Sequence, residues 1–258
     1  MQREAIVNYH IHSSQRQAFQ FDVDGIYGNL VSPELAPTKV NVRDIRGDEK
    51  TLNVPRDGVL FGRHSSAITD FSEGSDWQNT YNTELQTLLR DKLGAKEVIV
   101  FDHTVRIDDA NSPRQPARNV HNDYTAAGAE RRMANEIGEE RARELAAGHY
   151  SFINVWRPVL PIHSSPLGFI KPESITAEDY MTIDLVYPND LREILGVAAN
   201  SKHEWFYCSA MTPDEVIIFN TYDNHGQPHI AHSALDMKST SNLHTPRQSI
   251  ESRTIVRY

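Results

Sequence analysis

The sequence contains 258 residues with a formal net charge of −9, and 39% of its residues are hydrophobic. This length is enough for one large domain or two small ones, with a sizeable buried core. The negative charge argues against a nucleic-acid partner, which would require a basic surface. No apolar segment approaches the roughly 18–20 residues that cross a bilayer, and no signal-peptide layout is seen. The single cysteine, Cys208, excludes an internal disulfide and favours a cytoplasmic location.

The first 70 residues are expected to form short extended segments. Gln2–His10 alternates loosely, so His10 and His12 would share a face, which we interpret as polar strand surface rather than as a metal site. Thr38–Arg46 and Thr51–Val54 flank a Gly-Asp pair and predict a hairpin.

The middle of the chain mixes helices and strands. A helix is predicted over Asp76–Leu93, where leucines recur at helical spacing and Gly94 can end it. Glu97–Asp102 predicts a buried strand that continues to Arg106, and a loop follows over residues 108–118. Ala126–Gly148 predicts one or two amphipathic helices with a break near Gly138.

The second half of the chain is rich in strands separated by turn signals, a pattern typical of a sandwich or jelly roll. Leu191–Leu195 is an exception, for which we expect a helical turn closed by Gly196. No internal repeat or linker is present, so we expect a single domain, residues 1–258, mainly β with flanking helices. The predicted strands are Tyr150–Pro158, Pro166–Ile170, Met181–Val186, Glu204–Cys208, Glu215–Asn220, Gln227–Ala234 and Ser249–Tyr258.

His121 and Asp123 are separated by one residue, so in a strand their side chains point to the same face. Such a pair often forms a surface ion pair by chance. Together with one histidine from a distant strand, however, the His121–Asp123 pair would form the two-histidine, one-carboxylate facial triad. This triad holds Fe(II) on one face and leaves the positions on the opposite face of the ion open. His232 lies in a strand-like segment and is the best candidate for this third ligand. Its competitors are His225, His229 and His244.

Arg247 and Ser249 would share a strand face, where a guanidinium and a hydroxyl can together hold one carboxylate. Arg253 is a rival for this role because it lies on the same face. The order H-x-D, distal histidine, R-x-S is expected of Fe(II)/2-oxoglutarate oxygenases. In these enzymes 2-oxoglutarate occupies two metal positions, and its far carboxylate needs a buried cation.

Several further motifs accompany these residues. They are Val100–Thr104 with Arg106, His121–Thr125, Asn154–Pro158, Pro166-Leu167, Trp205-x-Tyr207, Met211–Val216, Tyr222-Asp223, Ala231–Ala234 and Arg247–Arg253. On this set the chain, from about Gly94 onward, resembles the CmcJ/NvfI-type family of Fe(II)/2-oxoglutarate-dependent oxygenases of secondary metabolism. The residues before it match only loosely.

The resemblance implies a double-stranded β-helix, a jelly-roll and cupin-like core over residues 94–258, with a more variable part over residues 1–93. It also implies Fe(II), with O2 and 2-oxoglutarate as co-substrates. The implied iron ligands are His121, Asp123 and His232, and the implied 2-oxoglutarate ligands are Arg247, Ser249 and Tyr207. The chain departs from the family at His229, where relatives carry a basic or aliphatic residue, and at Gln248, where they carry an acid.

Four residues are expected to line the substrate pocket: Tyr124, Asn154, Trp156 and Arg157. In a strand Asn154 and Trp156 share one face and Arg157 takes the other, so a bulge would be needed to turn all three inward. The alternative for Arg157 is an ion pair with Asp102 or Asp184. Aromatic residues such as Trp156, Trp205 and Tyr207 are more typical of a core than of a substrate contact.

We therefore expect an oxidoreductase that hydroxylates, desaturates or cyclises a small specialised metabolite and releases succinate and CO2. Two alternatives stay open, namely a non-catalytic cupin-like accessory protein and a non-haem iron enzyme that does not use 2-oxoglutarate. The sequence also leaves open the substrate, the reaction outcome and the oligomeric state, for which a homodimer is one option.

Overall fold

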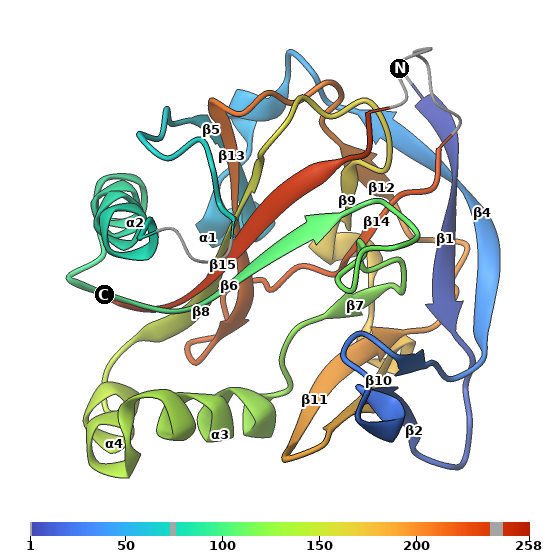
Figure 1. Cartoon of the computed structure of the whole chain (residues 1–258), viewed down its shortest axis with the longest axis horizontal. Helices are drawn as coiled ribbons and strands as arrows, with labels where there is room; N and C mark the ends of the chain where they lie inside the picture. Colours follow the sequence, from blue (N-terminus) through green and yellow to red (C-terminus); the bar gives the residue numbers. More distant parts are fainter. Residues whose placement is uncertain (1, 73–75, 238–244) are drawn as a thin grey trace.

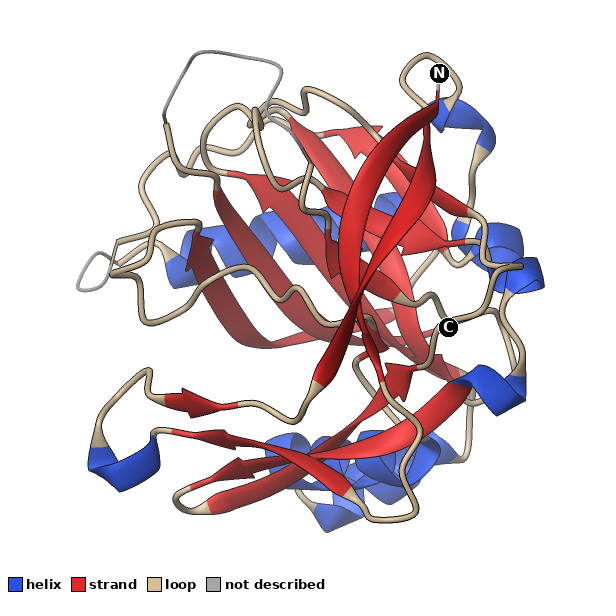
Figure 2. Cartoon of the chain, turned by 90° about the vertical axis from the view of Figure 1, so that its right-hand side faces the viewer, coloured by secondary structure: helices blue, strands red, loops and turns tan. Residues whose placement is uncertain are grey.

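The computed structural model describes residues 2–72, 76–237 and 245–258, and most of them belong to two facing β-sheets (Figures 1 and 2). The smaller sheet is antiparallel throughout. Its strand order is β5 (Val59–Arg63), β13 (Glu215–Asp223), β8 (Tyr150–Pro158), β15 (Gln248–Arg257) and β6 (Glu97–Ile107).

The larger sheet has ten strands and curls around the other side of the molecule (Figure 1). Its order is β1 (Gln2–His10), β4 (Leu35–Asp44), β12 (Trp205–Tyr207), β9 (Leu167–Ile170), β14 (His232–Ala234), β7 (His121–Asn122), β11 (Asp190–Val197), β10 (Tyr180–Tyr187), β2 (Gln17–Phe21) and β3 (Leu30–Val31). Together the two sheets confirm the predicted fold class, a mainly β jelly roll with flanking helices.

The helices lie outside the sheets. They are α1 (Val54–Asp57), α2 (Gln78–Leu93), α3 (Ala126–Ile137) and α4 (Glu139–Ala146), with short 3-10 segments at Val23–Gly25, Glu49–Thr51, Pro172–Ser174 and Ala177–Asp179. Gly94 ends α2 in the left-handed conformation, as predicted, and Gly138 separates α3 from α4. None of the helices in the described part of the chain is long and apolar enough to cross a membrane.

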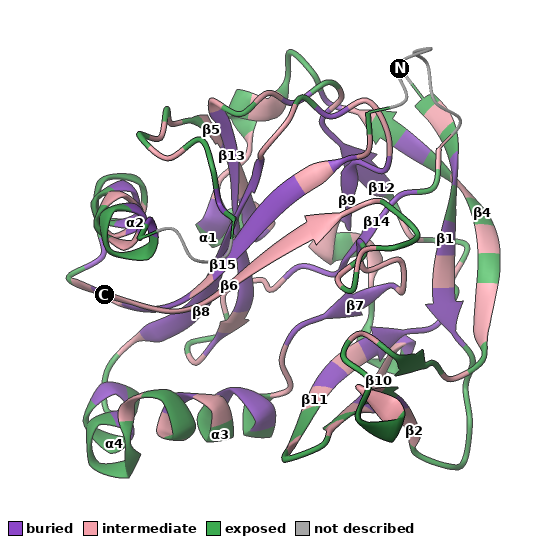
Figure 3. Ribbon diagram, in the orientation of Figure 1, coloured by how far each residue is buried: buried purple, intermediate pink, exposed green. Residues whose placement is uncertain are grey.

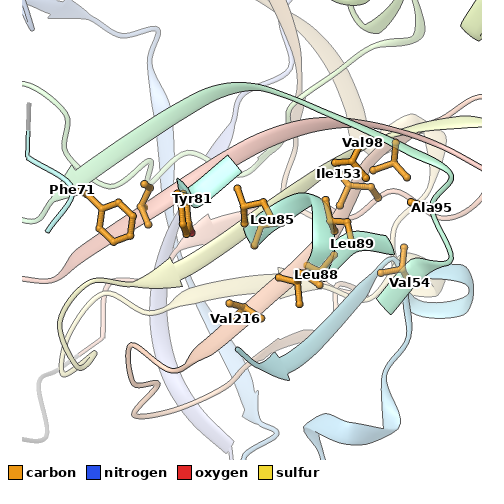
Figure 4. Packing of buried hydrophobic residues seen from close by; sticks show 14 of the residues in the cluster. Val54, Phe71, Tyr81, Leu85, Leu88, Leu89, Ala95, Val98, Ile153 and Val216 are labelled. Carbon is orange, nitrogen blue, oxygen red and sulfur yellow. The ribbon is translucent and has the colours of Figure 1, made fainter. Parts of the chain in front are cut away.

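The apolar faces of the elements divide into an inner and an outer core. The inner core lies between the sheets, where Trp156 and Phe219 of the small sheet belong to one cluster with Phe169 and Phe206 of the large sheet. On the outer face of the small sheet, α2 packs its leucines against Ile153 and neighbouring aliphatic side chains (Figure 4). Strands β8 and β15 are therefore buried on both faces, whereas the edge strand β6 is only half-buried (Figure 3).

The first 93 residues contribute strands to both sheets. Strand β4 pairs with β1 and β12, and β5 pairs with β13. The predicted hairpin joining Thr38–Arg46 to Thr51–Val54 is therefore wrong, because long-range pairing takes β4 and the second segment enters a 3-10 turn and α1. His10 is buried against Phe19 at the end of β1, and His12 is exposed but lies beyond the strand, so the predicted polar strand face shared by the two histidines is wrong.

Two further predictions differ from the structure. Leu191–Leu195 is not a helical turn but part of β11, which pairs with β10 along its whole length. The two strands are joined by only two residues, and this hairpin pairing overrides the weak helical preference of the segment. In the predicted strand Gln227–Ala234, only His232–Ala234 forms a strand, and the residues before it run as irregular chain.

Candidate metal centre

Strands β7 and β14 bring together two histidines from distant parts of the chain. His121 and His232 are direct partners in the antiparallel register of these strands. Asp123 follows β7 and places its Oδ1 atom 3.3 Å from His121 Nε2 and 3.7 Å from His232 Nε2. Ligand atoms that occupy adjacent positions about 2.1 Å from one ion would lie about 3 Å apart, so this spacing fits a shared ion. Within the described residues no other cluster has this property.

Both imidazoles have the tautomer that metal binding requires. The Nδ1 atom of His121 lies 2.8 Å from the carbonyl oxygen of Asn119, and that of His232 lies 3.2 Å from the carbonyl oxygen of Ile230. A carbonyl only accepts, so Nδ1 carries the proton and donates it. The Nε2 lone pairs are therefore free to bind an ion.

Neighbouring residues hold the H-N-D segment in place. Asn122 is fully buried and its side-chain amide donates to the carbonyl oxygens of Tyr124 and Thr221, which ties the segment to β13. Thr125 then caps α3 by accepting a hydrogen bond from the Gly128 amide. Strand alternation and this anchor point His121 and Asp123 to the same side.

The electrostatics keep His232 and Asp123 in the form that binds a metal. Burial and the charge of His121 lower the pKa of His232 to about 3, so this imidazole is neutral. Burial opposes ionisation of Asp123, but its contact with the His121 imidazole and the charge of Arg253 hold the pKa of this carboxyl well below its usual range. A neutral His232 and an ionised Asp123 are in the deprotonated form that binds a divalent cation.

Arg247 lines the cavity beside the two histidines and is only 2% exposed. Its Nε and Nη2 atoms donate to Ser249 Oγ at 3.3 and 3.1 Å, and Nη1 donates to the Ser165 carbonyl at 2.6 Å. Its guanidinium lies 5.2 Å from the centre of the Trp156 ring. A guanidinium has five N–H donors, so one donor on each terminal nitrogen of Arg247 has no acceptor among the described residues and can bind an external one.

The charge of Arg247 is not neutralised by any carboxylate of the described residues within ion-pair distance. Burial, with the neighbouring charge of Arg106, lowers the pKa of Arg247 to about 9, so the group is still cationic at neutral pH. A buried cation without a counter-ion is unfavourable, and a bound carboxylate would relieve this cost. Two N–H groups of one guanidinium can bind both oxygens of a carboxylate.

Arg253 is held by protein carboxylates instead. Its Nη1 atom lies 2.6 Å from Asp102, Nη2 lies 2.5 Å from Glu251, and Nε lies 3.4 Å from Asp123 Oδ2. Of the two rival arginines, Arg253 is therefore paired with carboxylates of the protein. Arg247 is not paired with any carboxylate of the described residues and could bind the carboxylate of a co-substrate.

The four expected pocket residues separate in space. Trp156 lines the cavity, and Asn154, on the same strand face, donates to Asp123 Oδ2 at 2.8 Å. Tyr124 packs against Phe152, with ring centres 4.6 Å apart, outside the cavity lining.

Arg157 requires a correction on both of its predicted roles. It lies on the other face of β8, where its Nη2 atom is 2.6 Å from His64 Nδ1 and its guanidinium lies over the Tyr81 ring. The expected partners Asp102 and Asp184 pair with Arg253 and Arg16 instead. Strand alternation places Arg157 outside the pocket, because no bulge interrupts its pairing with β15.

Tyr207 also requires a correction. It belongs to the buried cluster of Tyr9, Val42 and Trp205, on the face of β12 opposite to Phe206 and the inner core. Its hydroxyl finds no partner among the described residues. Tyr207 is therefore a core aromatic that does not contact the cavity.

The competitor histidines lie elsewhere or outside the described residues. His225 stacks on His149, with ring centres 4.4 Å apart, and His229 packs against Tyr180. His244 lies outside the described residues.

Three polar residues at the site did not appear among the predicted site residues. Arg106 and Glu251 line the cavity, and the Ser165 carbonyl binds Arg247. Arg106 is the register partner of Ser249 on β6, so strand pairing could have located it once the R-x-S motif was recognised. Ser165 sits in a loop with a φ of 46°, and no sequence signal marked its carbonyl.

Comparison with known proteins extends these observations. A family model described as an oxidoreductase/YMDC permease-like domain matches residues 7–257. The hydroxylase/desaturase efuI of Hormonema carpetanum is 30% identical over 247 residues, which cover 84% of this chain and 82% of the relative. The Fe(II)/2-oxoglutarate-dependent dioxygenase nvfI of Aspergillus novofumigatus is 27% identical and covers 85% and 83% of the two chains.

A solved structure has the same fold. The structure of the iron and alpha-ketoglutarate-dependent endoperoxidase NvfI superposes with a TM-score of 0.83 at 22% identity. The match covers 100% of this chain and 97% of the other, so the two proteins share one architecture along their whole length.

Proposed function

The chain belongs to the oxidoreductase/YMDC permease-like domain family, and we propose that it is a non-haem Fe(II)/2-oxoglutarate-dependent oxygenase acting on a small metabolite. The observation that carries this proposal is the convergence of His121, Asp123 and His232 beside a buried arginine, two of whose donors have no acceptor in the described part of the chain. Relatives named as dioxygenases and as hydroxylase/desaturases support the same reaction class.

In this assignment each residue has a defined task. His121, Asp123 and His232 hold the metal, and Arg247 binds the far carboxylate of 2-oxoglutarate through its two free N–H groups. Ser249 and the Ser165 carbonyl fix the plane of the guanidinium, and Trp156 covers one of its faces. When bound, Fe(II) couples the reduction of O2 to decarboxylation of 2-oxoglutarate, giving succinate, CO2 and an oxidised substrate.

The names of the relatives cover hydroxylation, desaturation and endoperoxide formation. One ligand set can support these different outcomes, because the outcome depends on which substrate atom is held nearest the metal. We therefore assign the substrate class as a small organic molecule whose oxidised position is selected by the cavity walls.

Two features support the remaining parts of the assignment. Cys208 is buried and unpaired, which supports a reducing compartment such as the cytoplasm. The pairing of β4 with β12 and of β5 with β13 supports treating residues 1–258 as one domain, in which the first 93 residues complete both sheets.

Succinate formation tests the proposal directly. The protein is loaded with Fe(II) under anaerobic conditions and mixed with O2, with and without 2-oxoglutarate and a panel of small metabolites. We expect succinate only when both Fe(II) and 2-oxoglutarate are present. Metal binding without succinate would instead indicate an iron enzyme that does not use 2-oxoglutarate, and failure to bind metal would indicate an accessory protein.

A further inference from the structure

Asn154 and Arg253 are direct register partners on β8 and β15, and both reach the same oxygen atom of Asp123. Asn154 Nδ2 lies 2.8 Å and Arg253 Nε lies 3.4 Å from Asp123 Oδ2. The other oxygen, Oδ1, faces the Nε2 atoms of the two histidines. The two carboxylate oxygens therefore have different surroundings, one facing protein donors and the other facing the metal position.

We propose that Asn154 and Arg253 are positioning residues that hold Oδ2 of Asp123 away from the metal, so that the carboxylate binds through Oδ1 alone. This inference rests on the proposed function, because it concerns the same metal centre.

The chemistry explains why such a restraint matters. A carboxylate can bind a metal through one oxygen or through both. If Asp123 used both, it would occupy a fourth position and leave too few sites for 2-oxoglutarate and O2 on the open side of the triad. Two hydrogen bonds to Oδ2 make that second metal bond unfavourable, because forming it would leave buried donors without a partner.

The orientations of both donors are fixed by their surroundings. Asp123 Oδ2 is an acceptor only, so the amide nitrogen of Asn154, and not its oxygen, must face it. Asn154 is 1% exposed. Arg253 cannot swing away without breaking its contacts with Asp102, Thr104 and Glu251. The pair thus forms a rigid support on two central strands, the arrangement that precise metal geometry requires.

The test compares Asn154→Leu with a control variant at Thr254, which belongs to the neighbouring residue pair between β8 and β15. Asn154→Leu removes the donor but retains most of the side-chain volume. Thr254→Val is the matched control, because it also removes one buried hydrogen bond, from Thr254 Oγ1 to the Ile153 carbonyl, without touching Asp123. For each protein we measure Co(II) affinity by competition with a chelator, the Co(II) ligand-field spectrum, and the rise in Tm that Co(II) causes.

We expect Asn154→Leu to weaken Co(II) binding by about 10- to 100-fold, the usual effect of removing a partner of a metal ligand. Its Co(II) spectrum should also change, because a second carboxylate oxygen would raise the coordination number. Thr254→Val should lower the Tm of the metal-free protein but keep the wild-type affinity and spectrum. Arg253→Lys, which keeps the charge but loses the Nε donor, should change the spectrum in the same direction as Asn154→Leu.

Wild-type affinity and an unchanged spectrum in Asn154→Leu would overturn the inference, as would an equal loss of affinity in Thr254→Val. The proposed function is tested separately by succinate formation. If the wild-type protein bound Co(II) but its Fe(II) form released no succinate, that function would be wrong, while the comparison of the two variants would still decide the positioning role.

Discussion

His121 and His232 lie directly opposite each other on β7 and β14, with ring centres 4.5 Å apart. The backbone register alone therefore places two candidate metal ligands on one face of the larger sheet. Each ring is oriented by a hydrogen bond from Nδ1 to a carbonyl two residues earlier, Asn119 for one and Ile230 for the other. The geometry of the proposed metal centre is therefore set by the pairing of β7 with β14, which leads to the following predictions.

Replacing His232 by alanine should abolish the metal centre. We expect the succinate rate to fall more than about 100-fold, because even a partner of a metal ligand commonly contributes 10–100-fold. His229→Ala is the control, since His229 packs on Tyr180 and should leave Co(II) binding intact. Loss of Co(II) binding in His229→Ala with retention in His232→Ala would reverse the two assignments.

Replacing Arg247 by alanine should raise the KM for 2-oxoglutarate at least about tenfold. Hydrogen bonds to charged groups contribute roughly 1.5–3 kcal/mol, and 1.4 kcal/mol corresponds to a factor of ten. Initial rates of succinate release at varied 2-oxoglutarate concentration provide the measurement. The control is Arg157→Lys, which alters an equally buried arginine on the other face of the small sheet and should leave this KM unchanged. A steep rise in an Arg253 variant but not in Arg247→Ala would transfer the role to Arg253.

Gly196→Ala should destabilise the larger sheet next to the metal centre. Gly196 is the register partner of His121, and an added Cβ would lie 2.6 Å from Ile183 Cγ1 and 2.7 Å from the His10 ring. Overpacking of this kind costs about 1–3 kcal/mol. For a chain of this size we expect a Tm decrease of roughly 2–10 °C in a thermal melt. Gly62→Ala, whose nearest contact would be 3.5 Å, should change the Tm far less.

Acidification should destabilise the protein through His103. Burial lowers the pKa of His103 to about 4 in the folded chain, against 6.5 in the unfolded chain. Between these values the unfolded chain takes up a proton that the folded chain does not, so stability falls as the pH decreases from about 6.5 to about 4. His103→Gln removes this group, and its Tm should fall less than the wild-type Tm between pH 7 and pH 5. Parallel Tm curves for the two proteins would contradict the assignment.

Much of the local structure follows from local patterns. The leucine repeat and Gly94 predicted α2, alternation predicted β8 within its exact bounds, and Gly138 predicted the break between α3 and α4. The predicted hairpin after β4 is wrong because β4 pairs with the distant strand β12, which local sequence does not specify. Strand β11 was missed for a local reason, because it forms a two-residue hairpin with β10 that the sequence analysis did not recognise.

The sequence by itself determined the identity and order of the reactive groups: an H-x-D pair, a distal histidine and an R-x-S motif. Those side chains already indicate the chemistry, because few ligand sets suit Fe(II) and a dicarboxylate together. Only the tertiary structure decided which groups meet. Within residues 2–72, 76–237 and 245–258, it left two donors of Arg247 without an acceptor, surrounded Arg253 with three carboxylates, and turned Tyr207 and Arg157 away from the cavity. The physical reason is that strand register and sheet curvature, set by contacts along the whole chain, determine which face each side chain occupies.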